Sequence, residues 1–202
     1  MNITEINQKL RTQSPQEIVT WALENAKKPV ITTNFRPYEA AILHACTRVE
    51  NDLKVIWCDT GYNTSYTYLH AEELISKLKL NIQLYVPRQS AAHRNVVLGI
   101  PGLEDPKHSL FSEQVKLEPF RRAMEEHQPD VWFTNLRKGQ TALRDTLDIL
   151  SVSADGVLKV SPFYHWSDQE LNNYLEIHDL PNEERYYDPT KLLSNRECGI
   201  HK

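Results

Sequence analysis

One cysteine near the carboxyl end, Cys198, has the neighbours that a reactive thiol needs. Arg196, His201 and Lys202 lie within four residues of it, and nearby positive charge favours the nucleophilic thiolate over the thiol. Gly199 gives the backbone beside the sulfur conformational freedom. A short polar tail of this kind can carry a sulfur into a site and out again to meet a second protein. A stray cysteine in a frayed chain end is the alternative interpretation.

A second group of reactive side chains lies in residues 32–37, which read Thr-Thr-Asn-Phe-Arg-Pro. The hydroxyls of Thr32 and Thr33, the amide of Asn34 and the guanidinium of Arg36 close an apolar run just before a helix is expected. Free backbone N–H groups at such a helix start bind phosphate or sulfate. Ordinary N-capping by Thr33 or Asn34 would explain the same residues.

A third segment, residues 135–144, holds three cations and a glutamine in a chain whose overall charge is −4. These side chains are Arg137, Lys138, Gln140 and Arg144. Because an arginine fork matches phosphate and sulfate oxygens bidentately, the segment predicts an anion site. A solvated basic turn is the alternative.

A fourth segment, Cys58-Asp59-Thr60-Gly61-Tyr62, ends another apolar run. Asp59 can accept hydrogen bonds from ribose hydroxyls or an adenine amine, or it can simply form a turn with Thr60 and Gly61. Cys58 and Cys46 lie among apolar neighbours, so we expect buried thiols there rather than nucleophiles.

Alternating strands and helices must position these segments. The second of two leading helices begins at Ser14 with a capping box, as does a later helix at Ser167. Apolar patterning predicts strands at 29–35, 53–58, 82–86, 130–134 and 157–160, and helices at 37–50, 65–79, 114–127 and 168–178. Strands that alternate with helices predict an α/β fold: an open, mostly parallel twisted sheet with helices on both faces. Ligands of such sheets bind beyond the carboxyl ends of the strands, where the segments above fall.

In two regions the apolar residues show neither a helical nor a strand periodicity. Residues 88–113 contain Gly99, Pro101, Gly102 and Pro106, and a connection this long is either a lid over a ligand or a surface excursion. Residues 180–195 are also irregular and lead into a C-terminal tail that we expect to be flexible. We therefore expect a single domain over 1–202, with N-terminal helices in 1–28, an α/β core in 29–178 and a C-terminal segment in 179–202.

The composition excludes several classes of protein. Hydrophobic residues make up 40% of the chain and charged residues 25%, as in soluble globular proteins. A net charge of −4 argues against nucleic-acid binding, and no apolar run is long enough to cross a membrane. Three cysteines without a Cys-x-x-Cys pair cannot build a four-cysteine metal site, and no histidine pair has ligand spacing. A reducing cytoplasm is the expected compartment.

Taken together, the motifs resemble the phosphoadenylyl-sulfate (PAPS) reductase family, within the adenine nucleotide alpha hydrolase-like fold. The resemblance covers residues 15–202. It is carried by Asp59-Thr60-Gly61-Tyr62, Lys116-Leu117-Glu118-Pro119, the segment Trp132–Thr141, and Arg196-Glu197-Cys198-Gly199-Ile200-His201. The last segment is similar to the family's Glu-Cys-Gly-Leu-His motif with one conservative change.

The resemblance implies a thiol mechanism in sulfate assimilation. Cys198 would attack the sulfur of the activated sulfate to give S-sulfocysteine, and reduced thioredoxin or glutaredoxin would then release sulfite. The implied substrate-binding residues are Thr32, Thr33, Asn34, Arg36, Asp59, Thr60, Gly61, Arg137, Lys138, Gln140, Arg144, Arg196 and His201. No cofactor, metal or iron–sulfur cluster is expected, because the paired cysteines of the adenylyl-sulfate (APS) branch are missing. The resemblance also permits a homodimer.

The chain departs from the family pattern at three places. The first loop, usually Ser-Ser-Ser-Phe-Gly, has Arg36 in place of the glycine, which would either block an oxyanion or add a charge to hold it. The family's Arg-Arg-Glu-Gln-Ser is here Arg137-Lys138-Gly139-Gln140-Thr141, and the connection from His178 to Arg196 is short. Two other functions therefore stay open: a nucleotide-binding paralogue with a regulatory or scaffolding role, and an APS-using variant. An ATP pyrophosphatase would need a Ser-Gly-Gly-x-Asp-Ser loop, which residues 32–38 lack.

Overall fold

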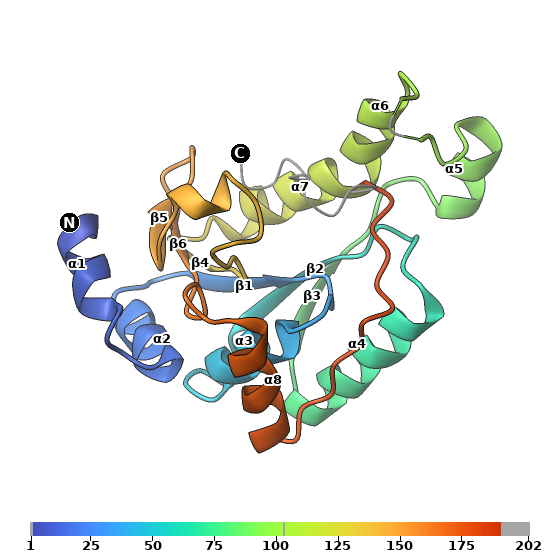
Figure 1. Ribbon diagram of the computed structural model, residues 1–202. Helices are drawn as coiled ribbons and strands as arrows, with labels where there is room; N and C mark the ends of the chain where they lie inside the picture. Colours follow the sequence, from blue (N-terminus) through green and yellow to red (C-terminus); the bar gives the residue numbers. More distant parts are fainter. Residues whose placement is uncertain (1, 103, 191–202) are drawn as a thin grey trace.

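The computed structural model describes residues 2–102 and 104–190, and its centre is a six-stranded sheet in the order β3-β2-β1-β4-β6-β5 (Figure 1). The strands are β1 (Pro29–Thr33), β2 (Lys54–Cys58), β3 (Asn81–Tyr85), β4 (Val131–Phe133), β5 (Leu150–Val152) and β6 (Leu158–Val160). All neighbouring strands pair in parallel except β5, which is antiparallel to β6. The expected open, mostly parallel sheet is confirmed.

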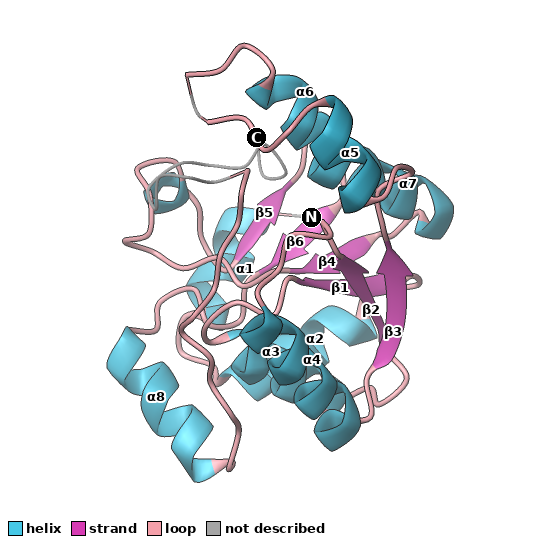
Figure 2. Ribbon diagram, turned by 90° about the vertical axis from the view of Figure 1, so that its right-hand side faces the viewer, coloured by secondary structure: helices cyan, strands magenta, loops and turns pink. Residues whose placement is uncertain are grey.

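Helices cover both faces of this sheet, as the strand–helix alternation predicts (Figure 2). They are α1 (Ile3–Leu10), α2 (Pro15–Glu24), α3 (Glu39–Thr47), α4 (Ser65–Leu78), α5 (Ala91–Val97), α6 (His108–Ser112), α7 (Glu118–His127) and α8 (Asp168–Ile177), with a π-helical turn η1 (Glu113–Leu117) and a 3₁₀ turn η2 (Arg144–Thr146). The helices α2, α3, α4 and α8 lie on one side of the sheet, and α7 lies on the other (Figure 1).

Neighbouring residues of each central strand enter different cores. In β1, Ile31 packs in the larger core beneath α2, α3 and α8, whereas Val30 packs in the smaller core beneath α7. In β4, Phe133 and Trp132 divide in the same way. Because both faces are covered, these strands read as continuous apolar runs rather than as alternating patterns.

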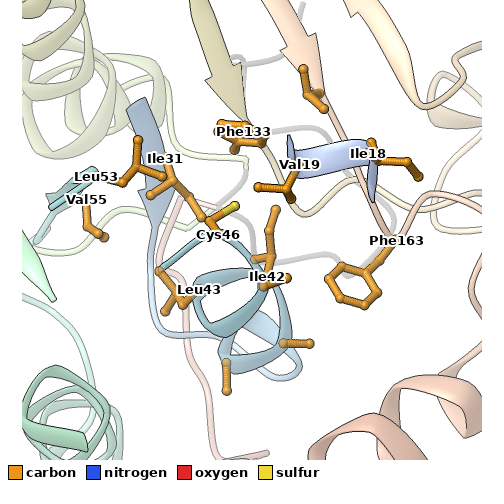
Figure 3. Packing of buried hydrophobic residues seen from close by; sticks show 14 of the residues in the cluster. Ile18, Val19, Ile31, Ile42, Leu43, Cys46, Leu53, Val55, Phe133 and Phe163 are labelled. Atoms are coloured by element: carbon orange, nitrogen blue, oxygen red, sulfur yellow. The ribbon is translucent and has the colours of Figure 1, made fainter. Parts of the chain in front are cut away.

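The larger core also contains the cysteine of α3. Cys46 is fully buried, and Figure 3 shows it beside Ile31 and Leu43. Burial raises the pKa of its thiol, because the charged form is disfavoured away from water. The expectation of a buried, unreactive Cys46 is confirmed.

Both predicted capping boxes are present. The Glu17 carboxylate accepts the backbone N–H of Ser14 at 2.7 Å, and the Ser14 hydroxyl accepts the backbone N–H of Glu17 at 3.3 Å. Ser167 and Glu170 repeat this arrangement at the start of α8. These local signals therefore fix where two of the helices begin.

Three details differ from the sequence-based expectation. The helix expected from residue 37 begins at Glu39, because Tyr38 adopts a left-handed backbone conformation with φ 68°. Residues 88–113 contain two short helices, α5 and α6, in a region expected to be irregular. The strand β5 was not predicted, and it pairs antiparallel with β6 at the edge of the mostly parallel sheet.

The side chain of Asn7 on α1 completes the outer edge of β5. Its amide nitrogen donates to the carbonyl of Leu150 at 3.0 Å, and its amide oxygen accepts the Leu150 N–H at 2.8 Å. Asn7 is 6% exposed, so both bonds are shielded from water. The side chain thus occupies the place of a neighbouring strand's peptide group.

After α8 the chain returns along α4 toward the carboxyl ends of the strands (Figure 1). Two contacts fix this return: Lys77 pairs with Asp179 at 2.7 Å, and the Thr64 hydroxyl donates to the carbonyl of Arg185 at 3.0 Å. Among the described helices, none is long and apolar enough to span a lipid bilayer.

Candidate active site

A cavity of about 600 Å³ lies at the carboxyl ends of β1, β2 and β4. Seven of the residues that the sequence assigns to the substrate come together in its wall: Thr32, Thr33, Asn34, Arg36, Arg137, Gln140 and Arg144. The segments after β1 and β4, 100 residues apart, thus meet at the sheet edge where ligands of parallel sheets bind.

The carboxylate of Glu39, at the start of α3, organises the loop after β1. It accepts the hydroxyl of Thr33 at 2.7 Å and the backbone N–H of Asn34 at 2.8 Å, and it pairs with Arg36 at 2.8 Å. Phe35 takes a left-handed backbone conformation, with φ 52°, which turns the loop back toward the helix. Glu39 therefore holds the loop that was expected to bind an anion, a role that no pattern in the sequence indicates.

Arg36, which replaces the family's glycine, links two loops. Its Nη2 donates to the backbone carbonyl of Asn135 at 2.9 Å, while its Nε is paired with Glu39. Because Arg36 lies in the cavity wall, the departure from glycine adds a positive charge there. It also fixes the spacing between the loops that follow β1 and β4.

The loop after β4 carries two arginines, Arg137 and Arg144, whose side chains are held in place by contacts with the protein. Arg137 pairs with Asp168 at 2.6 Å and stacks over the ring of Tyr38 at 5.2 Å. The side-chain oxygen of Gln140 accepts the backbone N–H of Arg137 at 3.1 Å and also accepts a hydrogen bond from the guanidinium of Arg144. Arg144 and Arg137 are buried, at 3% and 9% exposure. Because these guanidinium groups are buried and held in place, their charges are preorganised and act more strongly on an anion than charges exposed to water would.

A fourth cation of the wall was not assigned from the sequence. Lys116, in the π-helical turn η1, forms an ion pair with Asp188 on the returning C-terminal segment, and both residues line the cavity. Burial by itself would raise the pKa of the Asp188 carboxyl, but attraction to the Lys116 ammonium, with hydrogen bonds from Lys116 and Thr190, outweighs it and lowers that pKa. Single π-helical turns are frequent at functional sites, and here one directs a lysine into the cavity.

Apolar groups form another part of the wall. Ile56, Cys58 and Phe120 line the cavity, and the rings of Phe120 and Trp132 lie 5.2 Å apart. Burial raises the pKa of the Cys58 thiol to about 12, so this sulfur is protonated near neutral pH. An apolar surface beside cations suits a ligand with an aromatic base and anionic groups.

Four residues assigned to the substrate do not line the cavity: Asp59, Thr60, Gly61 and Lys138. The carboxylate of Asp59 serves its own turn, accepting the Gly61 N–H at 2.9 Å, the Asn63 amide at 2.8 Å and the Tyr68 hydroxyl at 3.0 Å. The structure therefore gives Asp59 the turn-forming role that the sequence left open. Cys198, Arg196 and His201 lie outside the described residues.

Residues 88–113 also lie away from this site. Of the described residues in that range, none lines the cavity. The fully buried Arg94 fixes the region, donating to the carbonyl of Gln89 at 2.5 Å and stacking over the ring of Tyr62 at 5.9 Å. Of the two interpretations, the surface excursion fits this placement better than the lid.

The charges of the described wall residues do not cancel. Arg36, Lys116, Arg137 and Arg144 face two carboxylates, Glu39 and Asp188, which leaves an excess of two positive charges. An α/β sheet of this order, with a cation-rich cavity and an apolar wall at the strand ends, defines a nucleotide-binding protein of the adenine nucleotide alpha hydrolase-like fold.

Comparisons with known proteins identify the family. The model of the phosphoadenosine phosphosulfate reductase domain matches residues 28–188, and the chain belongs to this family. It is 36% identical to a phosphoadenosine 5'-phosphosulfate reductase of Vibrio cholerae over 100% of the chain and 89% of that relative. It is also 36% identical to the enzyme of that name from Xylella fastidiosa, over 100% of the chain and 94% of the relative.

Solved structures agree on the fold. A phosphoadenylyl-sulfate reductase from Candida auris, in a phosphate complex, superposes with a TM-score of 0.80 at 24% identity, covering 90% of this chain and 88% of that one. An NH3-dependent NAD synthetase from Campylobacter jejuni shares the fold more distantly, with a TM-score of 0.56 at 12% identity over 89% and 75% of the two chains.

Proposed function

We propose that this protein reduces 3'-phosphoadenylyl sulfate to sulfite and adenosine 3',5'-bisphosphate, with a thiol protein as the electron donor. The observation that carries the proposal is the cavity at the strand ends, whose wall places Arg36, Lys116, Arg137 and Arg144 around one space. Membership of the phosphoadenosine phosphosulfate reductase family supports the same reaction.

The first step is a displacement at sulfur. The Cys198 thiolate attacks the sulfur of the sulfo group, a sulfur–sulfur bond forms and the bond from sulfur to the bridging phosphate oxygen breaks. Negative charge then moves onto the leaving phosphate of adenosine 3',5'-bisphosphate. Arginines already fixed in place, such as Arg137 and Arg144, stabilise that charge without reorganising.

The second step transfers electrons from the partner. A thiolate of reduced thioredoxin or glutaredoxin attacks Sγ of Cys198, and sulfite leaves with the electron pair of the broken bond. The partner's second thiol then closes its disulfide and releases the Cys198 thiolate, so that two electrons pass in each cycle. The thiols of such a partner stay reduced in the cytoplasm, and we place the reaction in that compartment.

Chain length allows Cys198 to reach the substrate. Asp188 lines the cavity, and Cys198 follows it by ten residues. An extended segment of that length spans at most ~33–36 Å, which is enough to turn back into the same cavity.

Intact mass measurement tests the proposal. The protein is incubated with 3'-phosphoadenylyl sulfate without a thiol donor, and we expect one SO3 group to be added to the wild type but not to Cys198→Ser. The matched control is Cys58→Ala, which removes the other thiol near the substrate and should keep the adduct. Absence of the adduct, or its survival in Cys198→Ser, would contradict the proposal.

The same assay separates the alternatives. Nucleotide binding in calorimetry without an adduct would favour a regulatory or scaffolding paralogue, and faster adduct formation with adenylyl sulfate would favour that substrate. Turnover with and without thioredoxin tests the donor, and light scattering tests the homodimer that the family resemblance permits.

A further inference from the structure

Two buried polar atoms in the cavity wall have no hydrogen-bond partner within residues 2–102 and 104–190. They are Oδ1 of Asn135 and Nε of Arg137, which follow β4 two residues apart. Asn135 is 6% exposed and Arg137 is 9% exposed. Because buried polar atoms in native proteins are nearly always hydrogen-bonded, this pair of atoms indicates a ligand that supplies both partners.

Other polar groups of the same wall already bond to the protein. The Thr32 hydroxyl oxygen accepts the indole N–H of Trp132 at 2.9 Å, and the Gln140 side-chain oxygen accepts the backbone N–H of Arg137. Among the described wall residues, the buried side-chain atoms without a partner are one acceptor, Asn135 Oδ1, and one neighbouring donor, Arg137 Nε. None of the earlier assignments includes Asn135.

The chemistry of the nucleotide narrows the choice of partner. Phosphoadenylyl sulfate offers two uncharged hydrogen-bond donors, the ribose 2'-hydroxyl and the exocyclic amine of adenine. The hydroxyl lies next to a phosphate, which can accept from a guanidinium, whereas the amine lies at the far edge of the base. An acceptor beside an arginine N–H therefore fits the hydroxyl better than the amine.

We propose that Asn135 is a specificity-determining residue that accepts a hydrogen bond from the ribose 2'-hydroxyl, while Nε of Arg137 donates to a phosphate oxygen of the same nucleotide. This inference rests on the proposed function for the identity of the ligand. It predicts that the site distinguishes ribonucleotides from deoxyribonucleotides through one side chain.

Calorimetry with two nucleotides tests the inference. Wild-type protein should bind adenosine 3',5'-bisphosphate about tenfold more tightly than its 2'-deoxy analogue, the effect of one neutral hydrogen bond. Asn135→Ala should bind the two nucleotides alike. Asn135→Asp retains the acceptor, so it should keep the preference while binding both more weakly, because its charge repels phosphate. This second variant covers the case in which the alanine variant fails to fold.

A matched control removes a similar atom elsewhere. Ser112 Oγ is also buried without a partner among the described residues, but Ser112 does not line the cavity. Ser112→Ala should therefore bind both nucleotides as the wild type does.

Three outcomes would overturn the inference. They are equal binding of the two nucleotides by the wild type, an undiminished preference in Asn135→Ala, and a preference that appears only against inosine 3',5'-bisphosphate, which lacks the amine. Binding is measured without sulfo transfer. Missing adduct formation would thus overturn the reductase function and leave this inference intact, whereas adduct formation without the ribose preference would do the reverse.

Discussion

The ammonium of Lys116 pairs with the carboxylate of Asp188 in the cavity wall, across 72 residues of sequence. Their side chains are 3% and 7% exposed, so water contributes little to solvating either charge. The pair joins the π-helical turn before α7 to the segment that returns from α8. Each charge is therefore stabilised by the other, and removing one of them should lower the stability of the folded protein.

Replacing the acid tests this dependence. Asp188→Asn should lower the free energy of unfolding by about 3–5 kcal/mol, because it removes the carboxylate that compensates a buried ammonium. Urea denaturation measures the change. Asp155→Asn, which alters an exposed turn aspartate, should change the stability by less than about 0.5 kcal/mol. Equal effects of the two variants would contradict a stabilising role for the pair.

The same pair gives a pH dependence. The pKa of Asp188 is lowered in the folded protein, so its contribution to stability is present above the unfolded value, about 3.9, and is lost as pH falls through the folded pKa. Below pH 4, the free energy of unfolding should therefore change less with pH for Asp188→Asn than for the wild type, as urea denaturation at several pH values would measure. If the substitution leaves this dependence of the unfolding free energy on pH unchanged, other carboxyl groups cause the loss of stability in acid.

Neighbouring cations of the loop after β4 should differ in function. Arg137 lines the cavity, whereas Lys138 is exposed and does not line it. Arg137→Met should weaken binding of adenosine 3',5'-bisphosphate by at least about tenfold, the scale of a lost charge-assisted hydrogen bond, and Lys138→Met by less than about twofold. Calorimetry at fixed salt compares them. A comparable loss in both variants would restore Lys138 to the substrate-binding set.

The cysteines should differ in reactivity. Burial raises the pKa of Cys58 to about 12 and also raises that of Cys46, so neither forms appreciable thiolate at neutral pH. Iodoacetamide at pH 7.5 should alkylate Cys198 in the folded protein and reach the other two only after denaturation, as peptide mass mapping would report. Alkylation of Cys58 at the rate of Cys198 would make both candidates for the nucleophile.

His44 lies on α3 and contacts α8, and it should make the stability depend on pH in a second pH range. Burial, with repulsion from His178 and Arg48, lowers the pKa of His44 to about 4, and its Nδ1 lies 2.9 Å from the Tyr174 hydroxyl. Between pH 6.5 and about 4 the unfolded chain binds this proton more readily, so stability falls as the pH falls through that range.

Substituting that histidine isolates its effect. His44→Gln should reduce the slope of unfolding free energy against pH between 6.5 and 4, because the glutamine does not titrate. The exposed His93 gives the matched control, His93→Gln, which should leave the slope unchanged. A slope that persists in His44→Gln would remove His44 as its source.

Local sequence patterns were sufficient for most of the fold. Central strands such as β1 and β4 are buried on both faces and read as apolar runs, and the capping boxes at Ser14 and Ser167 marked two helix starts. β5 escaped prediction because Leu150-Ser151-Val152 offers only two apolar residues, and its strand conformation depends on antiparallel pairing with β6.

The candidate site was likewise predicted in part. Arg36, Arg137 and Arg144 were predicted to bind an anion because they follow apolar runs, and they do meet in one cavity. Lys116 and Asp188 were not assigned, because their pairing depends on the chain returning from α8 over a distance that no local pattern records. The motif Lys116-Leu117-Glu118-Pro119 carried part of the family resemblance, but the sequence alone did not place its lysine in the site.

Asn7 seals the β5 edge with a side chain, and this has a consequence for handling the protein. A truncation that removes α1 would leave the N–H and carbonyl of Leu150 open to a strand from another molecule. Shortened versions that begin at α2 would then form intermolecular sheets and aggregate, even though the distant cavity keeps all its described wall residues.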